Sequence, residues 1–484
     1  MHKIKTILTL LLLLALHMQL PAQRTSVKDM RNRVKRLQQQ IKEKETEPLK
    51  KTFSKEADDD RNNRLSIVIQ YYFRRIKQDV ITLIKWILLA ILTGFVMGGI
   101  SSLFSFVLTK VTEFREGHLW IFLFLPVAGL IIVFLYKKIG KQDGGVNQVF
   151  STITMKDDVA FRSAPLIFIS TALTHLVGGS AGREGAAIQL GGSIGNQLGR
   201  WLKLDEQDRH VMVMSGMSAA FAALFGTPMA AAIFSMEVVS VGVMYYTALV
   251  PCVISSLIAA KFAAGLGIHP EVFHVSKIPQ LTMISGLKMG IIAVGCAVIS
   301  VIFCVALKQT SVVFQKRLKN KYIRVVVAGV VIILITCCLQ TTDYMGAGIG
   351  GITDAIEHGR ANPTAFFWKI VLTAITMRAG FKGGEIVPSF FVGATFGCSM
   401  GHLLGLSPSL CAAAGMAAVF CGVTNCPITS ILIAFELFGF EGVSYYLIAV
   451  SISYAASGYY SLYKDQTIVY SKYKAKYVNR HTRM

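Results

Sequence analysis

The stretch GGSAGREGAAIQLGGSIGNQL, residues 178–198, joins a glycine-rich turn to an apolar run. We expect the turn to end near Glu184 and a helix to begin there. The first backbone N–H groups of a helix have no partner within it, and they lie at the positive end of the helix dipole. Such a helix start attracts an anion without a cationic side chain. The stretch therefore predicts an anion site at a helix start.

Glu184 places a carboxylate at this predicted site. The carboxylate would compete with an anion for the same N–H donors, and after taking a proton it would swing aside and let the anion pass. Glu184 is therefore a candidate gate and proton-transfer group. The alternative is that Glu184 pairs with Arg183 and only caps the helix.

Apolar segments extend from this stretch in both directions. Of 484 residues, 53% are hydrophobic and 16% are charged, whereas a soluble domain carries about 25% charged residues. Apolar segments recur from about Val80 to Tyr459, and many have the roughly 20 uncharged residues that a bilayer-spanning helix needs. The sequence predicts an all-α integral membrane protein that crosses the cell inner membrane several times.

The net charge of +22 could suggest a nucleic-acid partner, but the basic residues cluster between the apolar segments. Basic flanks hold cytoplasmic loops inside and contact anionic lipids. We therefore expect the lipid bilayer, and no nucleic acid, as a partner. The nine cysteines show no metal-ligand spacing, so neither a metal nor a cofactor is expected.

The chain divides by composition into four parts. Residues 1–23 resemble an export signal or an extra anchor, and residues 24–79 form a basic polar linker. The membrane domain covers residues 80–465, and residues 466–484 form a basic cytoplasmic tail.

An internal repeat divides the membrane domain. The segment from Gly216 to Glu237 matches the segment from Gly415 to Glu436, 199 positions later. Upstream, four glycines recur at an offset of 202 positions: Gly182, Gly191, Gly195 and Gly199 pair with Gly384, Gly393, Gly397 and Gly401. The repeat predicts two halves, about 80–270 and 271–465, with opposite orientation in the bilayer. Several apolar segments are short and rich in Gly or Pro. Such segments are typical of helices that stop part-way through the membrane and line a cavity.

The second half contains a second predicted helix start, GGEIVP, residues 383–388. Pro388 suits the first turn of a helix. Glu385 is unexpected beside it, because a second carboxylate repels the anion that the helix ends attract. Acidic residues inside a membrane are costly and usually functional, so Glu385 is a second candidate gating and proton-transfer group. The alternative is an ion pair with Lys382 or Arg378.

Together these motifs resemble the chloride-channel (CLC) family of anion channels and anion/proton exchangers, over roughly residues 80–465. The resemblance implies a homodimer with one pore per subunit, and a bundle of tilted, partly spanning helices in inverted halves. It also implies that Glu184 is the external gate, and that backbone amides, a serine and a tyrosine hold the anion.

The anion-binding positions implied by the resemblance are Gly182, Arg183, Gly185, Gly384, Ile386, Val387, Val146, Asn147 and Tyr463. Tyr460 is the second choice for the tyrosine. An interfacial aromatic belt is the alternative interpretation of both tyrosines.

Three departures from the family pattern resemble its fluoride-exporting branch. The family's Gly-Ser-Gly-Ile-Pro motif should lie near residues 143–148, which read DGGVNQ, so the anion-binding serine is missing. Residues 384–388 read GEIVP in place of Gly-x-Phe-x-Pro. Val238 follows Glu237 where chloride/proton exchangers carry two glutamates. One feature differs from the fluoride branch, which usually has threonine at the position of Val387.

These features predict transmembrane anion transport, with fluoride/proton exchange as the first expectation. A voltage-gated chloride channel or a chloride/proton exchanger is the alternative. An intramembrane hydrolase would need a Ser–His or His–carboxylate constellation, and none is apparent, so we expect no enzyme. We expect His118, His175 and His402, like the repeat-related Glu237 and Glu436, to serve as structural groups at helix ends.

Overall fold

The computed structural model describes residues 61–139, 145–154, 159–474 and 476–482. The expected signal-like segment 1–23 and linker residues 24–60 lie outside them. The chain divides into two units at residues 81 and 82, and the packing described below lies within 82–484. Residues 61–79, expected in the linker, form the first part of α3 (Arg61–Gly117).

Helices make up most of the described chain and confirm the expected all-α membrane fold. The first half contains α3, η1 (Leu119–Phe124), α4 (Leu125–Lys138), α5 (Val146–Thr154), α6 (Ser163–Leu176), α7 (Glu184–Trp201), α8 (Glu206–Phe225), α9 (Pro228–Glu237), η2 (Tyr246–Ala248) and α10 (Leu249–Gly265). The second half contains α11 (Met283–Arg317), α12 (Lys321–Leu339), α13 (Ile349–Glu357), α14 (Ala365–Ala379), α15 (Ile386–Leu404), α16 (Pro408–Thr424), α17 (Pro427–Phe438) and α18 (Val443–Ala456).

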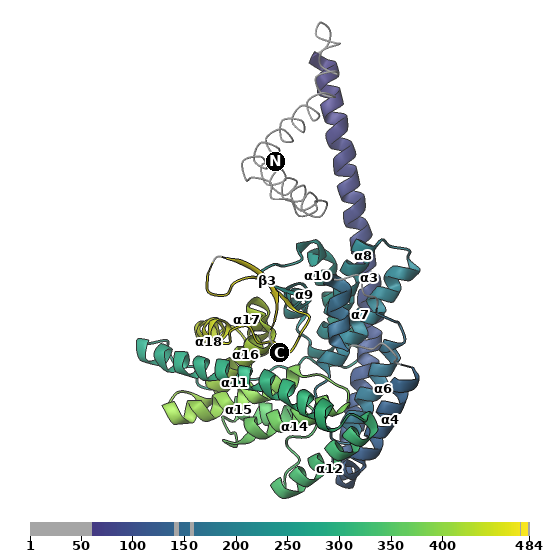
Figure 1. The fold of residues 1–484 in the computed structure, drawn as a ribbon. Coiled ribbons are helices and arrows are strands. Elements are labelled where there is room, and N and C mark those ends of the chain that lie inside the picture. Colours follow the sequence, from purple (N-terminus) through teal and green to yellow (C-terminus); the bar gives the residue numbers. More distant parts are fainter. Residues whose placement is uncertain (1–60, 140–144, 155–158, 475, 483–484) are drawn as a thin grey trace, which may run out of the picture. The chain divides into compact units, whose positions relative to one another are not determined.

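Helix lengths agree with the predicted mixture of full and partial spans. Among the described residues, six helices are long and apolar enough to cross a bilayer, and four further apolar helices have only 10–17 residues. Figure 1 shows the first-half helices α4, α6 and α7 gathered on one side and the second-half helices α11, α14 and α15 on the other.

The two halves pack their central helices at equivalent glycines. A Cβ atom on Gly191 in α7 would collide with the carbonyl oxygen of Gly216 in α8. A Cβ atom on Gly393 in α15 would likewise collide with the carbonyl oxygen of Gly415 in α16. Small residues let membrane helices approach closely. The glycines of the sequence repeat therefore mark two equivalent helix crossings.

Glu237 and Glu436 cap one another's helices across the halves. The carboxylate of Glu237 accepts hydrogen bonds from the N–H groups of Ile428 and Thr429 at the start of α17, at 3.1 and 2.9 Å. The carboxylate of Glu436 accepts hydrogen bonds from Met229 and Ala230 at the start of α9, both at 2.9 Å. The predicted helix-end role of both glutamates is confirmed.

The expected tail forms a β-hairpin. Strands β2 (Thr467–Tyr470) and β3 (Tyr477–His481) are antiparallel, and β2 runs parallel to β1 (Ser240–Val241). The buried Gln466 before β2 donates hydrogen bonds to the carbonyl oxygens of Val238 and Thr424, at 2.8 and 2.7 Å. The hairpin is therefore tied to both halves of the helical bundle.

Candidate functional site

The two predicted helix starts meet at an antiparallel bridge between Gly182 and Gly384. The N–H of Gly182 donates to the carbonyl oxygen of Gly384 at 2.8 Å, and the reciprocal hydrogen bond is 2.6 Å long. A Cβ atom on Gly384 would lie 2.6 Å from the nitrogen of Gly185 and 3.0 Å from that of Glu184. Glycine here therefore allows the starts of α7 and α15 to lie next to one another.

The carboxylate of Glu184 is seated at the first turn of α7. Glu184 is fully buried, and its Oε2 accepts a hydrogen bond from the N–H of Arg183 at 3.0 Å. Its Oε1 lies 3.7 Å from Nε of Arg183 and has no hydrogen-bond partner among the described residues. The carboxylate therefore occupies N–H donors at the helix start, where an anion would compete with it.

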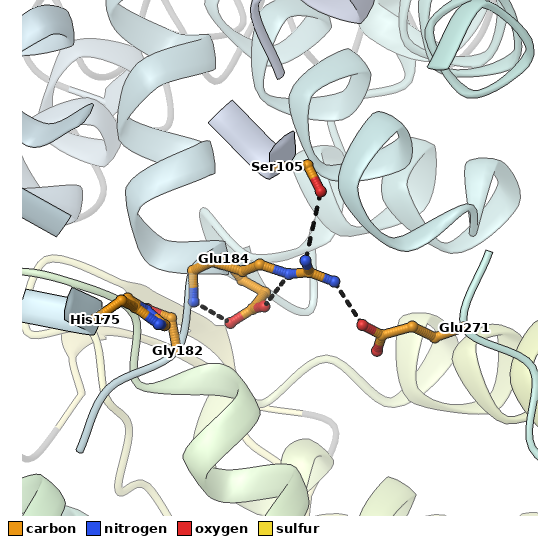
Figure 2. Close-up of polar contacts among 6 residues, drawn as sticks. Ser105, His175, Gly182, Glu184 and Glu271 are labelled. Atoms are coloured by element: carbon orange, nitrogen blue, oxygen red, sulfur yellow. Dashed lines mark hydrogen bonds and ion pairs between the residues drawn. The ribbon is translucent and has the colours of Figure 1, made fainter. Parts of the chain in front are cut away.

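Arg183 connects the Glu184 turn to two distant segments, through Ser105 and Glu271, which are labelled in Figure 2. Its Nη2 lies 2.5 Å from Oε1 of Glu271, and its Nη1 lies 3.5 Å from Oγ of Ser105. Sequence reasoning missed Glu271, because it lies 88 positions from Arg183 in a loop without a motif.

The buried His175 lies beneath the same turn, with Nε2 3.3 Å from the carbonyl oxygen of Gly182. Its own carbonyl oxygen accepts a hydrogen bond from Nη1 of Arg115 at 3.1 Å. His175 stands in the last turn of α6, so its predicted helix-end role is confirmed.

Glu385 is ion-paired at the start of α15. Nη2 of Arg378 in α14 lies 2.7 Å from Oε1 of Glu385. The ammonium of Lys382 lies over the ring of Tyr136, 4.0 Å from its centroid. The sequence left Lys382 and Arg378 as possible partners of Glu385, and in the structure the partner is Arg378.

A cavity of about 220 Å³ lies beside the two helix starts, and we call it the Tyr463 cavity. Its lining includes Val146, Asn147, Gly185, Gly384, Glu385 and Tyr463 from the predicted set, together with Gln189, Arg378 and Lys382. Tyr463 is the only hydroxyl-bearing residue among the described residues that line it. Tyr460, the second choice, does not line this cavity.

The other predicted positions lie around the cavity. Ile386 and Val387 are buried in the first turn of α15. A Cβ atom on Gly182 would lie 3.1 Å from Cβ of Val387. Arg183 lines a separate cavity of about 600 Å³, which we call the Arg115 cavity because Arg115 also lines it.

Lys369 is a further buried cation that sequence reasoning missed. Its ammonium is fully buried in α14 and donates hydrogen bonds to the carbonyl oxygens of Tyr344 and Gly346, at 3.1 and 2.8 Å. Both carbonyls belong to a loop that follows α12 and borders the Arg115 cavity. The residue lies in an apolar segment, and nothing in its sequence spacing indicated these partners.

Comparison with known proteins agrees with this geometry. The profile of the voltage-gated chloride channel family matches residues 128–458. A "Chloride/fluoride channel protein" of Pseudomonas syringae pv. tomato is 35% identical over 83% of this chain and 91% of its own length. An "H(+)/Cl(-) exchange transporter ClcA" of Vibrio vulnificus is 25% identical over 79% of this chain and 89% of its own length.

Solved structures show the same architecture. The crystal structure of a CLC-type fluoride/proton antiporter superposes with a TM-score of 0.77 and 33% identity, covering 80% of this chain and 98% of that one. A slow cyanobacterial Cl⁻/H⁺ antiporter, 17% identical, has the same fold with a TM-score of 0.67. The paired helix starts and these matches lead to one conclusion: the chain belongs to the voltage-gated chloride channel (CLC) family and is an anion transporter of the CLC type.

Proposed function

We propose that this transporter exchanges fluoride for protons across the cell inner membrane, as a homodimer with one pathway per subunit. The observation that carries the proposal is the Gly182–Gly384 bridge, which brings together two helix starts and a carboxylate from each half. The relatives support the choice of ion, because one is named a chloride/fluoride channel protein and another a fluoride/proton antiporter.

Basic residues give the proposed orientation. Lys137 and Lys138 end α4, and Lys316 and Arg317 end α11. By the positive-inside rule these ends face the cytoplasm. Residues 145–147, soon after α4, line the Tyr463 cavity, so this cavity opens inward. Leu119, before the opposite end of α4, lines the Arg115 cavity, which therefore opens outward.

In the proposed cycle, the N–H groups at the starts of α7 and α15 and the hydroxyl of Tyr463 hold the anion. Gly182, Arg183, Gly185, Gly384, Ile386 and Val387 supply the helix-start backbone, and Val146 and Asn147 border the anion in place of the missing serine. A proton from outside neutralises Glu184, which leaves the N–H donors to the anion. Loss of the proton inward lets the carboxylate return to its seat.

Fluoride suits this site because it is small, strongly hydrated and a good hydrogen-bond acceptor. A protonated Glu385 could donate a hydrogen bond to it, as carboxylic acids do when held neutral in a buried site. Chloride is the second candidate, since Val387 offers an apolar side chain where the fluoride branch usually has threonine.

Efflux from liposomes tests the proposal. Vesicles loaded with fluoride or chloride are diluted into anion-free medium, and the released anion and the external pH are recorded together. We expect faster release of fluoride, with external alkalinisation as protons enter. Faster release of chloride would indicate that chloride is the transported anion. Release without any pH change would indicate a channel.

The same assay tests Glu184. In Glu184→Gln the side chain can no longer exchange a proton, so we expect anion flux to stall or to continue without proton movement. The control is Glu113→Gln, whose carboxylate is exposed and paired with Lys110 at 2.8 Å. Such surface pairs contribute about 0–1 kcal/mol, so coupling should be unchanged in the control.

A further inference from the structure

The ion pair between Arg378 and Glu385 stands at the lining of the Tyr463 cavity. Arg378 is in the last turn of α14, and Glu385 is the N-cap residue of α15. The two side chains are 22% and 14% exposed, and both line the cavity. The loop between them folds back, so that the guanidinium lies directly beside the second helix start.

The pair removes the electrostatic conflict that Glu385 creates. A lone carboxylate here would repel any anion drawn to the helix starts, and it would be costly to hold at this depth. With Nη2 of Arg378 at 2.7 Å, the pair has no net charge. Glu385 is also the only acidic residue among the described residues that line the Tyr463 cavity.

Arg378 has unused hydrogen-bonding capacity. Its Nε is buried and has no hydrogen-bond partner among the described residues. A guanidinium carries five N–H donors in a planar fork and remains protonated at any physiological pH. It can therefore change partners, but it cannot lose its charge.

The other titratable groups near the pair are Lys382 and Tyr463, which line the same cavity, and Cys304, which lies close enough to interact with both charges. Glu184 and Glu385 both lie close enough to Tyr463 to interact with it. The ammonium of Lys382 is over the ring of Tyr136. Among the described groups, the ion pair that Glu385 makes is with Arg378.

We propose that Arg378 is an anion-binding residue of the pathway, held by Glu385 whenever the site is empty. The inference rests on the proposed function and deepens it. A proton that binds a carboxylate oxygen of Glu385 removes its negative charge and breaks the ion pair. The guanidinium then holds the incoming anion in its place. When the anion leaves, Glu385 gives up the proton and pairs with Arg378 again.

This exchange of partners links anion and proton. In the empty state Arg378 is balanced by the ionised Glu385, and in the loaded state by the anion beside a neutral Glu385. The summed charge of Arg378, Glu385 and the bound anion is zero in both states, so each anion bound requires a proton bound. If the proton comes from outside and the anion from inside, the cycle moves them in opposite directions.

Binding with proton counting tests the inference. Purified full-length protein in weakly buffered detergent is titrated with fluoride and separately with chloride, while calorimetry gives affinity and a pH electrode gives proton uptake. Wild type should take up about one proton at Glu385 per anion bound, besides the proton that Glu184 takes. Arg378→Gln should weaken binding by about 10-fold or more, because a charge-assisted contact is lost. Glu385→Gln should bind the anion and take up about one proton fewer per anion than wild type, and Arg378→Lys should retain the wild-type uptake.

Arg324→Gln is the matched control. Nε of Arg324 donates to the carbonyl oxygen of Ala379, the neighbour of Arg378, at 3.1 Å, and Arg324 does not line the Tyr463 cavity. It should bind anions and take up protons as wild type does.

The inference is overturned if Arg378→Gln binds both anions with wild-type affinity and proton uptake. If Arg378→Gln is not monodisperse by gel filtration, Glu385→Gln provides the test. Proton uptake in Glu385→Gln equal to that of wild type would also overturn the inference. Failure of the proposed function looks different. If the proposed function is wrong, the liposomes show a preference for chloride or anion flux without proton movement. The titration with chloride then still measures whether Arg378 contributes to anion affinity.

Discussion

At Gly182, the absence of a side chain makes room for the Glu184 carboxylate, the proposed gate. A Cβ atom there would lie 2.5 Å from Oε2 of Glu184 and 3.0 Å from Cδ of Pro388. The first belongs to a side chain that can move, and the second to a rigid ring in the facing helix start. Glycine therefore allows both the seat of Glu184 and the approach of the two halves.

We predict that Gly182→Ala displaces the Glu184 carboxylate from its seat. Overpacking at such a site costs about 1–3 kcal/mol, so the thermal midpoint should fall and anion flux should depend less on external pH. Gly265→Ala is the control, because no atom lies within 4 Å of its added Cβ. Equal pH profiles in wild type and Gly182→Ala liposomes would contradict the assigned role of this glycine.

Sequence patterns located the residues of the site better than their partners. Glu184 and Glu385 follow from local motifs, since a glycine turn before an apolar run marks a helix start. Arg378 appeared only as one of two partners for Glu385, because loop geometry decides which cation is within reach. Glu271 and Lys369 were not predicted at all. Their partners are a side chain 88 positions away and two loop carbonyls, and no periodicity encodes such contacts.

At the scale of elements, the two capping glutamates fasten each half to the other. Each carboxylate accepts two backbone N–H groups at the start of a short helix in the opposite half. These donors would otherwise have no partner. Glu237 therefore caps the start of α17.

We predict that Glu436→Gln lowers stability and leaves coupling intact. A glutamine oxygen can accept one of the two hydrogen bonds but carries no charge for the helix dipole, a loss of about 0.5–2 kcal/mol. The thermal midpoint in detergent should therefore fall, while the ratio of protons to anions in liposomes stays at the wild-type value. A changed ratio would mean that Glu436 carries protons.

The C-terminal hairpin positions the tyrosine of the site. Oγ1 of Thr482 donates a hydrogen bond to the carbonyl oxygen of Tyr463 at 2.7 Å. The ring of Tyr463 packs edge-on against that of Phe150, with the ring centroids 4.8 Å apart. The basic composition of residues 466–484 predicted a tail and concealed this hairpin. Its strands are short, and their pairing depends on a partner more than 200 positions earlier, at Ser240.

We predict that Gln466→Ala loosens this hairpin. The change leaves the carbonyl oxygens of Val238 and Thr424 without their amide donor, and each unsatisfied buried group costs about 1–3 kcal/mol. Fluoride affinity should fall as Tyr463 loses its fixed position, and the thermal midpoint should drop. Lys474→Ala, at an exposed position of the same hairpin, is the control. Unchanged fluoride affinity in Gln466→Ala would show that the hairpin does not position the tyrosine.

For the whole molecule, the repeat made the architecture predictable. Equivalent glycines at the two helix crossings and equivalent helix starts at the Gly182–Gly384 bridge come from the same repeated segments. The bridge itself is a contact between halves, and sequence could only indicate that the two starts face one another. The proposed exchange places proton and anion where these halves join.

Proton-driven transport of fluoride without a fluoride gradient tests that claim most directly. Liposomes with equal fluoride on both sides, and with the membrane voltage clamped by potassium and valinomycin, are acidified outside. Passive HF enters from the acidic side, so leakage moves fluoride inward. We expect net fluoride release toward the acidic side, and no such release from Glu184→Gln liposomes. Fluoride that stays inside, or moves inward as in protein-free vesicles, would contradict it.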